Sequence, residues 1–309
     1  MRFSVALAAV AVLAGCTTPV TPPEGGSAWG PLDAATGVGE FALEVDYDGR
    51  TRSLLVHLPP TPEPDALVLA LHGRFGSGAS MRDFSGFSEI ADREGFVVVY
   101  PDGVARSWAD GRGTTPADQR GVDDVGFLAE VVRRVRDRFP IPADRVFAAG
   151  MSNGGFMAQR LAVERADLVG GIGTVAGSVS DELDTTQGPS EPVAVAFVHG
   201  TEDTLVPYAG DPEENMLGIE DAARRWAGFN GCPAPRLTET IDAEPDGTQV
   251  LIYDAAPCDE QASVRLYRVE GGGHTWPGSL TDPLPPFLVG RTSQEIMASE
   301  VLWDFFDAR

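Results

Sequence analysis

The sequence predicts an α/β fold with a mostly parallel central sheet flanked by helices and an antiparallel hairpin at the N-terminal edge. Short, continuously apolar runs are typical of strands buried on both faces of a parallel sheet. Helical patterns lie between these runs, and this alternation favours parallel strands joined by helical crossovers. The apolar runs occupy residues 66–71, 95–100, 145–149 and 193–198, with a further candidate at 170–175.

The other elements follow from shorter patterns. Residues 41–47 alternate apolar and polar side chains, Asp48-Gly49 supplies a turn, and residues 53–58 continue the pattern, which predicts the hairpin. Two helices are expected at 126–139 and 156–165, and a late strand pair at 249–253 and 264–269. A closing amphipathic helix is expected at 293–307, with an inner face made of Ile296, Val301, Leu302 and Phe305.

The first 39 residues are expected to lie outside this fold. The apolar run at 3–13 is too short to cross a bilayer and fits the core of a signal peptide. It ends in Leu13-Ala14-Gly15-Cys16, which resembles the lipobox of bacterial lipoproteins and predicts a signal peptide at 1–15 with lipidation of Cys16. The alternative is an ordinary secretory signal in which Cys16 is incidental. Either way the chain is exported, anchored to the cell envelope or secreted.

A flexible tether at 16–39 is expected next, because these residues are rich in Pro, Thr, Gly and Ala without hydrophobic periodicity. Residues 40–309 are then expected to form one domain. The net charge of −23 repels phosphate backbones and anionic headgroups, so we expect no nucleic-acid partner and membrane contact through the anchor only.

Two cysteines remain when Cys16 is set aside, and an even pair in an oxidising compartment predicts a disulfide between Cys232 and Cys258. The alternative is a pair of free buried thiols. The four histidines are scattered along the chain, so no metal site and no other cofactor are expected.

The segment Gly150-Met151-Ser152-Asn153-Gly154 lies between a predicted strand and a predicted helix. This is the context of a nucleophile elbow, in which a sharp turn lifts a serine hydroxyl clear of the sheet. A chain with 36 glycines can also contain such a pattern by chance. The interpretation therefore depends on finding a base, an acid and oxyanion donors for Ser152.

Candidates for the acid and the base follow later strands. Asp203 comes just after the run at 193–198, and Glu202 competes with it. His274 lies in a glycine-rich loop after the run at 264–269, and it is the one histidine that follows both Ser152 and Asp203. This order suits an elbow of this kind. His57 lies within the predicted hairpin, and His72 and His199, which each precede a glycine at a strand end, are expected to be structural.

The oxyanion donors are expected from backbone amides. The run at 66–71 leads into His72-Gly73-Arg74-Phe75-Gly76, and the N–H of Arg74 and the N–H of Asn153 are the predicted pair. A phosphate-binding loop is excluded, because no Lys-Ser or Lys-Thr pair follows these glycines.

Taken together, these motifs resemble the secreted poly(3-hydroxybutyrate) depolymerase and feruloyl esterase group of α/β-hydrolases. The resemblance covers nearly the whole mature chain and implies an exported serine esterase that acts on polyester or on acyl groups of plant polysaccharide. Arg74-Phe75 departs from it, since many relatives carry a small residue or cysteine and glycine there, and a bulky pair narrows the mouth of the site. The resemblance lies in residues 72–73, 100–103, 107–108, 122–125, 150–155, 199–203, 206–207 and 273–278.

Other residues keep two interpretations. Trp108 and Trp276 form either an aromatic wall for the substrate or ordinary packing. Asp123 and Asp124 either orient the loops of the site or cap a helix.

Two other functions also compete with the esterase. One is a serine peptidase of the prolyl-oligopeptidase kind, although the chain has no room for the usual propeller domain. The other is a non-catalytic surface lipoprotein that binds without reacting.

Overall fold

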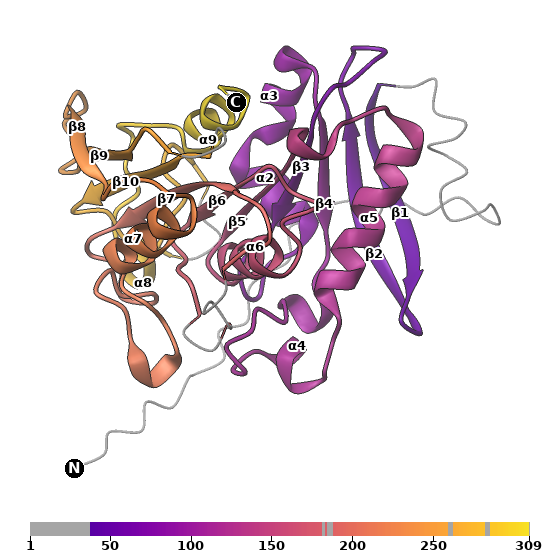
Figure 1. Ribbon diagram of the computed structural model, residues 1–309, viewed down its shortest axis with the longest axis horizontal. Coiled ribbons are helices and arrows are strands. Elements are labelled where there is room, and N and C mark those ends of the chain that lie inside the picture. The colour runs from indigo at the N-terminus through magenta and orange to yellow at the C-terminus, as the bar shows by residue number, and fades with distance from the viewer. Residues whose placement is uncertain (1–37, 181–182, 184–187, 259–261, 282–284, 309) are drawn as a thin grey trace.

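The computed structural model describes residues 38–180, 183, 188–258, 262–281 and 285–308 (Figure 1). The expected signal peptide, the lipidation site Cys16 and nearly all of the expected tether lie outside the described residues. Within the described ranges, no helix combines the length and the apolar character that a membrane span requires.

One ten-stranded sheet runs through the protein in the order β1-β2-β4-β3-β5-β6-β7-β10-β9-β8. The neighbours from β4 to β10 in this order are parallel, whereas both edges of the sheet are antiparallel. The predicted mostly parallel sheet with an N-terminal hairpin is therefore confirmed. The strands are β1 (Gly39–Tyr47), β2 (Arg50–Leu58), β3 (Leu67–Leu71), β4 (Val97–Pro101), β5 (Val146–Met151), β6 (Gly171–Val175), β7 (Ala194–Gly200), β8 (Arg236–Ile241), β9 (Gln249–Ala255) and β10 (Val264–Glu270).

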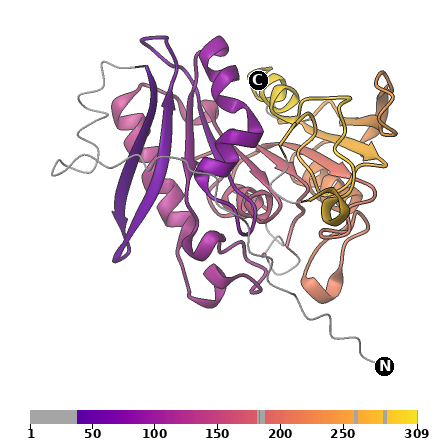
Figure 2. The same ribbon diagram turned by 180° about the vertical axis from the view of Figure 1, so that it is seen from behind.

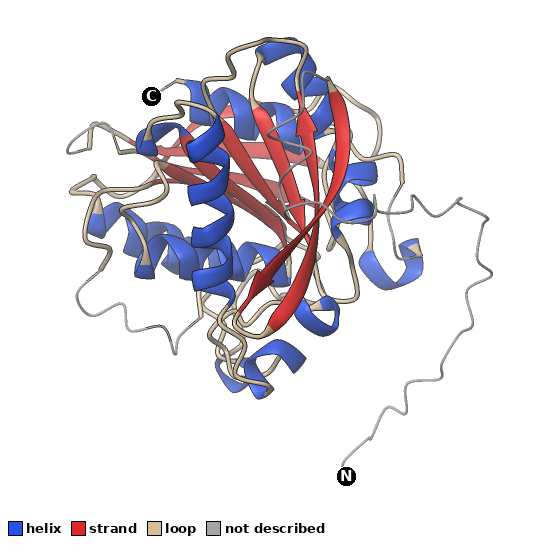
Figure 3. Ribbon diagram, turned by 90° about the vertical axis from the view of Figure 1, so that its right-hand side faces the viewer, coloured by secondary structure: helices blue, strands red, loops and turns tan. Residues whose placement is uncertain are grey.

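Helices cover both faces of the sheet, as Figures 1 and 2 show from opposite sides and Figure 3 shows from the edge. One face carries α5 (Asp124–Arg138), α6 (Asn153–Glu164) and α7 (Ile219–Phe229). The other face carries α2 (Gly78–Ser85), α3 (Phe87–Glu94) and α9 (Ala298–Asp307). The short helices are η1 (Val104–Arg106), α4 (Pro116–Gln119), η2 (Ala143–Arg145), η3 (Pro212–Glu214) and α8 (Pro286–Val289).

Strand β3 shows why the continuously apolar runs become central strands. Its side chains alternate between the two faces, so Leu67 and Leu69 pack in the core under α5, α6 and α7, while Val68 and Ala70 pack under the opposite helices. All four are fully buried. A strand with helices on both sides needs an apolar residue at every position, which is the pattern of the sequence.

The predictions miss some elements. The closing helix begins at Ala298 rather than at residue 293, because Ser293 and Gln294 are held by other loops: Gly278 N donates to Ser293 O (2.8 Å) and Gln294 N to Asp246 Oδ2 (2.6 Å). Strand β8 lies at the sheet edge with mostly exposed residues, so it lacks the apolar signal of the buried strands. Helices α2, α3 and α7 were not predicted either.

Cys232 and Cys258 form a disulfide with a Cα–Cα distance of 4.2 Å across a sequence separation of 26. The bond joins the segment that follows α7 to the segment that follows β9. The predicted pairing is therefore present, and it links a surface helix to the antiparallel edge of the sheet.

Candidate active site

Ser152 lies at the tip of a tight turn between β5 and α6. Its backbone has φ 53° and ψ −120°, a conformation that costs a non-glycine residue strain energy, and its N–H donates to Val175 O (2.8 Å). The turn also needs glycines: a Cβ on Gly150 would overlap the carbonyl of Gly154, and a Cβ on Gly154 would overlap the carbonyl of Leu71. The strand, the strained serine and the helix form the geometry that the sequence motif predicts.

Asp203 and His274 meet at the carboxyl ends of neighbouring strands. Asp203 follows β7 and His274 follows β10, and His274 Nδ1 lies 2.7 Å from Asp203 Oδ2. Both side chains are buried. The two loops are also joined by their backbones, because Glu202 N donates to Gly272 O (2.8 Å).

Four donors fix the Asp203 carboxylate. Oδ1 accepts the N–H groups of Leu205 (2.9 Å) and Val206 (2.8 Å). Oδ2 faces His274 and also the Nε2 of buried His199 at 3.3 Å. Burial alone raises the pKa of this carboxyl group, but the hydrogen bonds from His199 and His274 outweigh it and hold the pKa well below its usual range. Asp203 is therefore ionised at neutral pH.

Glu202, the competing acid, points elsewhere. Its side chain is exposed and lies 3.3 Å from the guanidinium of Arg291. In the structure Asp203, and not Glu202, contacts the imidazole of His274.

Ser152, Asp203 and His274 share one edge of the sheet, because β5, β6, β7 and β10 are consecutive parallel strands. Among the described residues, no hydrogen bond joins Ser152 Oγ to His274. Such contacts are often long in unliganded enzymes and shorten in the substrate complex. Because Nδ1 faces Asp203, Nε2 is the ring nitrogen left for Ser152.

The loop that carries Arg74 lies directly against the serine, since a Cβ on Gly73 would be 3.4 Å from Ser152 Cβ. Within the described part of the chain, neither Arg74 N nor Asn153 N donates a hydrogen bond to another residue, whereas Phe75 N donates to Arg106 O (2.8 Å). Asn153 is also the first residue of α6, so its amide lies at the positive end of the helix dipole. Two amides next to Ser152 are thus available to an anion.

The two tryptophans lie in the core and present no surface to a substrate in this structure. Trp108 is 0% exposed and donates from Nε1 to His72 O (2.9 Å). Trp276 is 1% exposed and packs against Phe84 and Phe87. Of the two interpretations drawn from the sequence, the packing role fits these positions.

Two exposed apolar side chains are close in sequence to residues of the site: Phe75, 59% exposed, follows Arg74, and Leu205, 47% exposed, comes two residues after Asp203. Phe75 follows the proposed oxyanion residue and has φ 68°. The guanidinium of Arg74 lies 5.1 Å from its ring centroid. The sequence marked Phe75 through its departure from the family pattern, but Leu205 carried no such signal.

Three histidines lie outside the acid–base pair. His57 Nε2 lies 2.7 Å from Asp92 Oδ1, and His72 accepts the N–H of Gly103 at Nε2 (2.9 Å). His199 differs, because its contact with Asp203 Oδ2 places it behind the candidate acid. Sequence reasoning missed this contact, since a histidine at a strand end gives no indication of what it faces across the loop.

The neighbouring carboxylates Asp123 and Asp124 divide the two roles between them. Asp123 caps α5, because its side chain accepts Gly126 N (2.8 Å). Asp124 is buried and accepts Ala109 N at Oδ2 (2.7 Å) and Arg52 at Oδ1 (2.7 Å). Only Asp124 therefore holds a loop near the site.

No three His, Cys, Asp or Glu side chains cluster as a metal site requires, within the residues that the structure describes.

Comparisons with known proteins identify the family of the chain. The profile of the family described as "Esterase PHB depolymerase" matches residues 53–194. A protein of Nocardia uniformis subsp. tsuyamanensis, provisionally named esterase NocK, is 30% identical over 338 residues and aligns with 98% of this chain and 97% of its own length. The probable feruloyl esterase C of Aspergillus niger is 27% identical, with 87% of this chain and 84% of that protein aligned.

Two further comparisons extend the picture. The bifunctional acetylxylan esterase/xylanase XynS20E of Neocallimastix patriciarum is 24% identical over 89% of this chain, which spans 39% of that larger protein. Among solved structures, the acetyl xylan esterase from Aspergillus awamori superposes with a TM-score of 0.55 and 14% identity, covering 87% of this chain and 100% of that one. At this identity the superposition supports the fold.

Proposed function

The chain belongs to the PHB depolymerase family of esterases and hydrolyses carboxylic esters, and we propose that Ser152, His274 and Asp203 carry out the acyl transfer. The observation that carries this proposal is the strained serine at the start of α6 on the same sheet edge as a buried Asp203–His274 pair. A serine held in this way, with two free amides beside it, serves nucleophilic attack on a carbonyl better than any role in packing.

The proposed reaction has two halves. His274 Nε2 takes the proton of Ser152 Oγ as the oxygen attacks the ester carbonyl, and the imidazolium then protonates the leaving alcohol. Water, deprotonated by the same nitrogen, cleaves the acyl-enzyme and releases the acid. Asp203 keeps the Nδ1 proton in place and stabilises the imidazolium, a role that suits a carboxylate whose pKa is depressed.

The N–H groups of Arg74 and Asn153 are the proposed oxyanion donors. Their support is their location beside Ser152 and their lack of a partner among the described residues. A donor of this kind contributes on the order of 3 kcal/mol to transition-state stabilisation.

The substrate class we propose is an ester with an apolar acyl group, either in polyhydroxybutyrate-type polyester or as a feruloyl or acetyl group on polysaccharide. Its support comes from the family to which the chain belongs and from the names of the relatives. Export is also proposed: the apolar run at 3–13, Cys16 and the disulfide all suit a protein that is lipid-anchored or secreted.

The first experiment labels the mature protein with a fluorophosphonate probe and measures hydrolysis of p-nitrophenyl acyl esters. The wild type should be labelled and active, whereas Ser152→Ala should be folded, unlabelled and inactive. Full activity in Ser152→Ala would remove the assignment of the nucleophile, and an unlabelled, inactive wild type would favour a non-catalytic binding protein.

A second experiment addresses the substrate. Short-chain acyl esters, methyl ferulate, acetylated xylan and polyhydroxybutyrate film are compared under the same conditions, with a peptide amide included. We expect ester cleavage and no amide cleavage. Faster cleavage of the amide would favour a peptidase of the prolyl-oligopeptidase kind.

A further inference from the structure

Residues 103–115, here called the bridging loop, contain η1 and end at Thr115, the N-cap of α4. The loop is tied to the segment that carries Arg74 by four hydrogen bonds. Gly103 N donates to His72 Nε2 (2.9 Å), and Trp108 Nε1 donates to His72 O (2.9 Å). Arg106 O accepts Phe75 N (2.8 Å), and Arg106 Nε donates to Gly76 O (3.3 Å). The residues on both sides of Arg74 are thus tied to the bridging loop.

The same loop is tied to Asn153 through the asparagine side chain. Asn153 Oδ1 accepts Trp108 N (2.8 Å), and Asn153 Nδ2 donates to Trp108 O (3.1 Å) and to Asp110 Oδ2 (2.6 Å). Asn153 and Asp110 are both buried. One loop therefore contacts both residues whose backbone amides are the proposed oxyanion donors.

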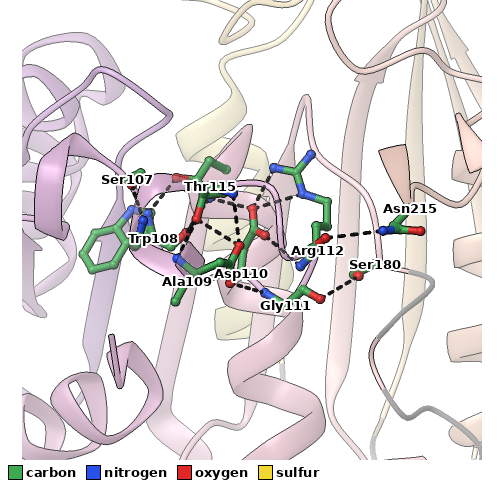
Figure 4. A network of polar contacts seen from close by, with 12 residues as sticks. Ser107, Trp108, Ala109, Asp110, Gly111, Arg112, Thr115, Ser180 and Asn215 are labelled. Carbon is green, nitrogen blue, oxygen red and sulfur yellow. Dashed lines mark hydrogen bonds and ion pairs between the residues drawn. The ribbon is translucent and has the colours of Figure 1, made fainter. Parts of the chain in front are cut away.

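The bridging loop is itself held on the side away from the oxyanion donors. Arg112 donates to Asp110 Oδ2 from Nε (3.1 Å) and from a terminal nitrogen (2.7 Å), and its guanidinium lies 3.8 Å from the ring centroid of Phe156 in α6. Figure 4 shows the next contacts, from Gly111 O to Ser180 Oγ (3.3 Å) and from Arg112 O to Asn215 Nδ2 (3.3 Å). Asp110 thus joins Asn153 to a fixed cation.

We propose that the bridging loop sets the spacing of the two oxyanion amides, with the side chains of Asn153 and Asp110 as positioning residues. This inference rests on the proposed function. The Arg74 amide comes from the loop after β3 and the Asn153 amide from the start of α6, so no shared peptide unit fixes the distance between them. Oxyanion donors act only when they lie about 2.7–3.1 Å from the developing charge, so this spacing matters.

Asp110 suits this position better than an amide would. A carboxylate only accepts, and Oδ2 lies between donors from Asn153 and Arg112, while Oδ1 accepts Arg112 N (3.2 Å). An asparagine at 110 that keeps its oxygen between Asn153 and Arg112 would turn its NH2 group toward Arg112 N, and the opposite orientation would turn it toward Asn153 Nδ2. In either orientation Asn153 loses a charged acceptor, so its contact with residue 110 weakens while the volume stays the same.

The test compares Asn153→Ala and Asp110→Asn with a matched control, Asn230→Ala. Asn230 is a buried asparagine that clamps Val193 in the same manner, accepting its N–H (3.3 Å) and donating to its carbonyl (2.7 Å), but it follows α7 and takes no part in the proposed site. The control therefore measures how much activity is lost when a buried asparagine that binds the backbone is removed and the oxyanion donors are left unchanged.

Each variant is assayed on a p-nitrophenyl ester and on its thiono analogue, in which sulfur replaces the carbonyl oxygen. Sulfur accepts hydrogen bonds poorly, so a thiono ester gains little from oxyanion donors. We expect Asn153→Ala to lower kcat on the oxygen ester about 100-fold with KM little changed, and Asp110→Asn about 10-fold. The rate ratio of oxygen ester to thiono ester should fall in both variants and stay at the wild-type value in Asn230→Ala.

Unchanged kcat and an unchanged rate ratio in Asn153→Ala and Asp110→Asn would overturn the inference. So would an equal loss on both esters, since that would mean general damage to the site. Failure of the proposed function looks different, because Ser152→Ala would then retain activity. If Asn153→Ala does not fold, Asp110→Asn, which preserves volume, decides the question by its rate ratio.

Discussion

Replacing Asp203 with asparagine tests the acid more sharply than removing its side chain. In the wild type, Oδ1 accepts Leu205 N and Val206 N, while Oδ2 faces the ring nitrogens of His274 (2.7 Å) and His199 (3.3 Å). An asparagine of the same shape keeps its oxygen on the two backbone N–H groups. Its NH2 group must then point toward the histidines.

This orientation reverses the hydrogen bond to His274. Nδ1 becomes the acceptor, the ring proton moves to Nε2, and that nitrogen can no longer take the proton of Ser152. Loss of the correct tautomer together with the carboxylate that stabilises the imidazolium costs about 10⁴-fold in kcat. At about 1.36 kcal/mol for each factor of ten, the barrier rises by about 5.4 kcal/mol.

The assay is steady-state hydrolysis of p-nitrophenyl butyrate, with circular dichroism to check that the fold is retained. Glu202→Gln is the matched control, because it makes the same chemical change one residue away on an exposed side chain whose partner is Arg291. The control should keep nearly full activity. The reasoning is refuted if Asp203→Asn stays within tenfold of the wild type, and the acid is reassigned if Glu202→Gln is the inactive variant.

Three further predictions follow from the structure. The pKa of the Asp203 carboxyl group is depressed in the folded protein, so its contribution to stability is present above the unfolded pKa of about 3.9 and is lost as the pH falls through the folded pKa. In urea unfolding, Asp203→Asn should therefore lose less stability in acid than the wild type. Phe75→Gly removes an exposed ring next to Arg74 and relieves a positive φ, so kcat/KM for methyl ferulate should rise several-fold relative to p-nitrophenyl acetate, and an unchanged ratio would show that Phe75 does not limit access. The double variant Cys232→Ser and Cys258→Ser removes a disulfide that stabilises the folded state by about 3.5 kcal/mol on the chain-entropy model. Tm measured by calorimetry should fall by about 10 °C, and a fall of under about 2 °C would contradict this expectation.

The sheet was predictable from sequence because its strands are buried on both faces. Residues such as Leu67 and Val68 point to opposite sides, yet both meet helices, so apolar character continues without a break. The chain order of Ser152, Asp203 and His274 was readable for a related reason. Each follows a parallel strand, and parallel strands end at the same edge of the sheet.

Contacts between loops were not predictable in this way. Trp108 and Trp276 are next to motif residues in sequence, but the structure turns both rings into the core, where Trp108 bonds His72 O and Trp276 packs on Phe84. Asp110 carried no signal at all, because most aspartate side chains are solvated. Its burial depends on Arg112, two residues along the same loop, and on Asn153 at the start of α6.

The two halves of the proposed triad differ in how far they are assembled without substrate. On the acid side every contact is made: two backbone N–H groups hold Oδ1 of Asp203, and two histidines face Oδ2. The contact between Ser152 Oγ and His274 is not formed within the described residues. The serine backbone is fixed between β5 and α6, and the imidazole is held at Nδ1 by the buried Asp203. The backbone of the serine and the ring of the histidine are thus ordered before substrate binds, which keeps the entropic cost of reaching the reactive geometry small.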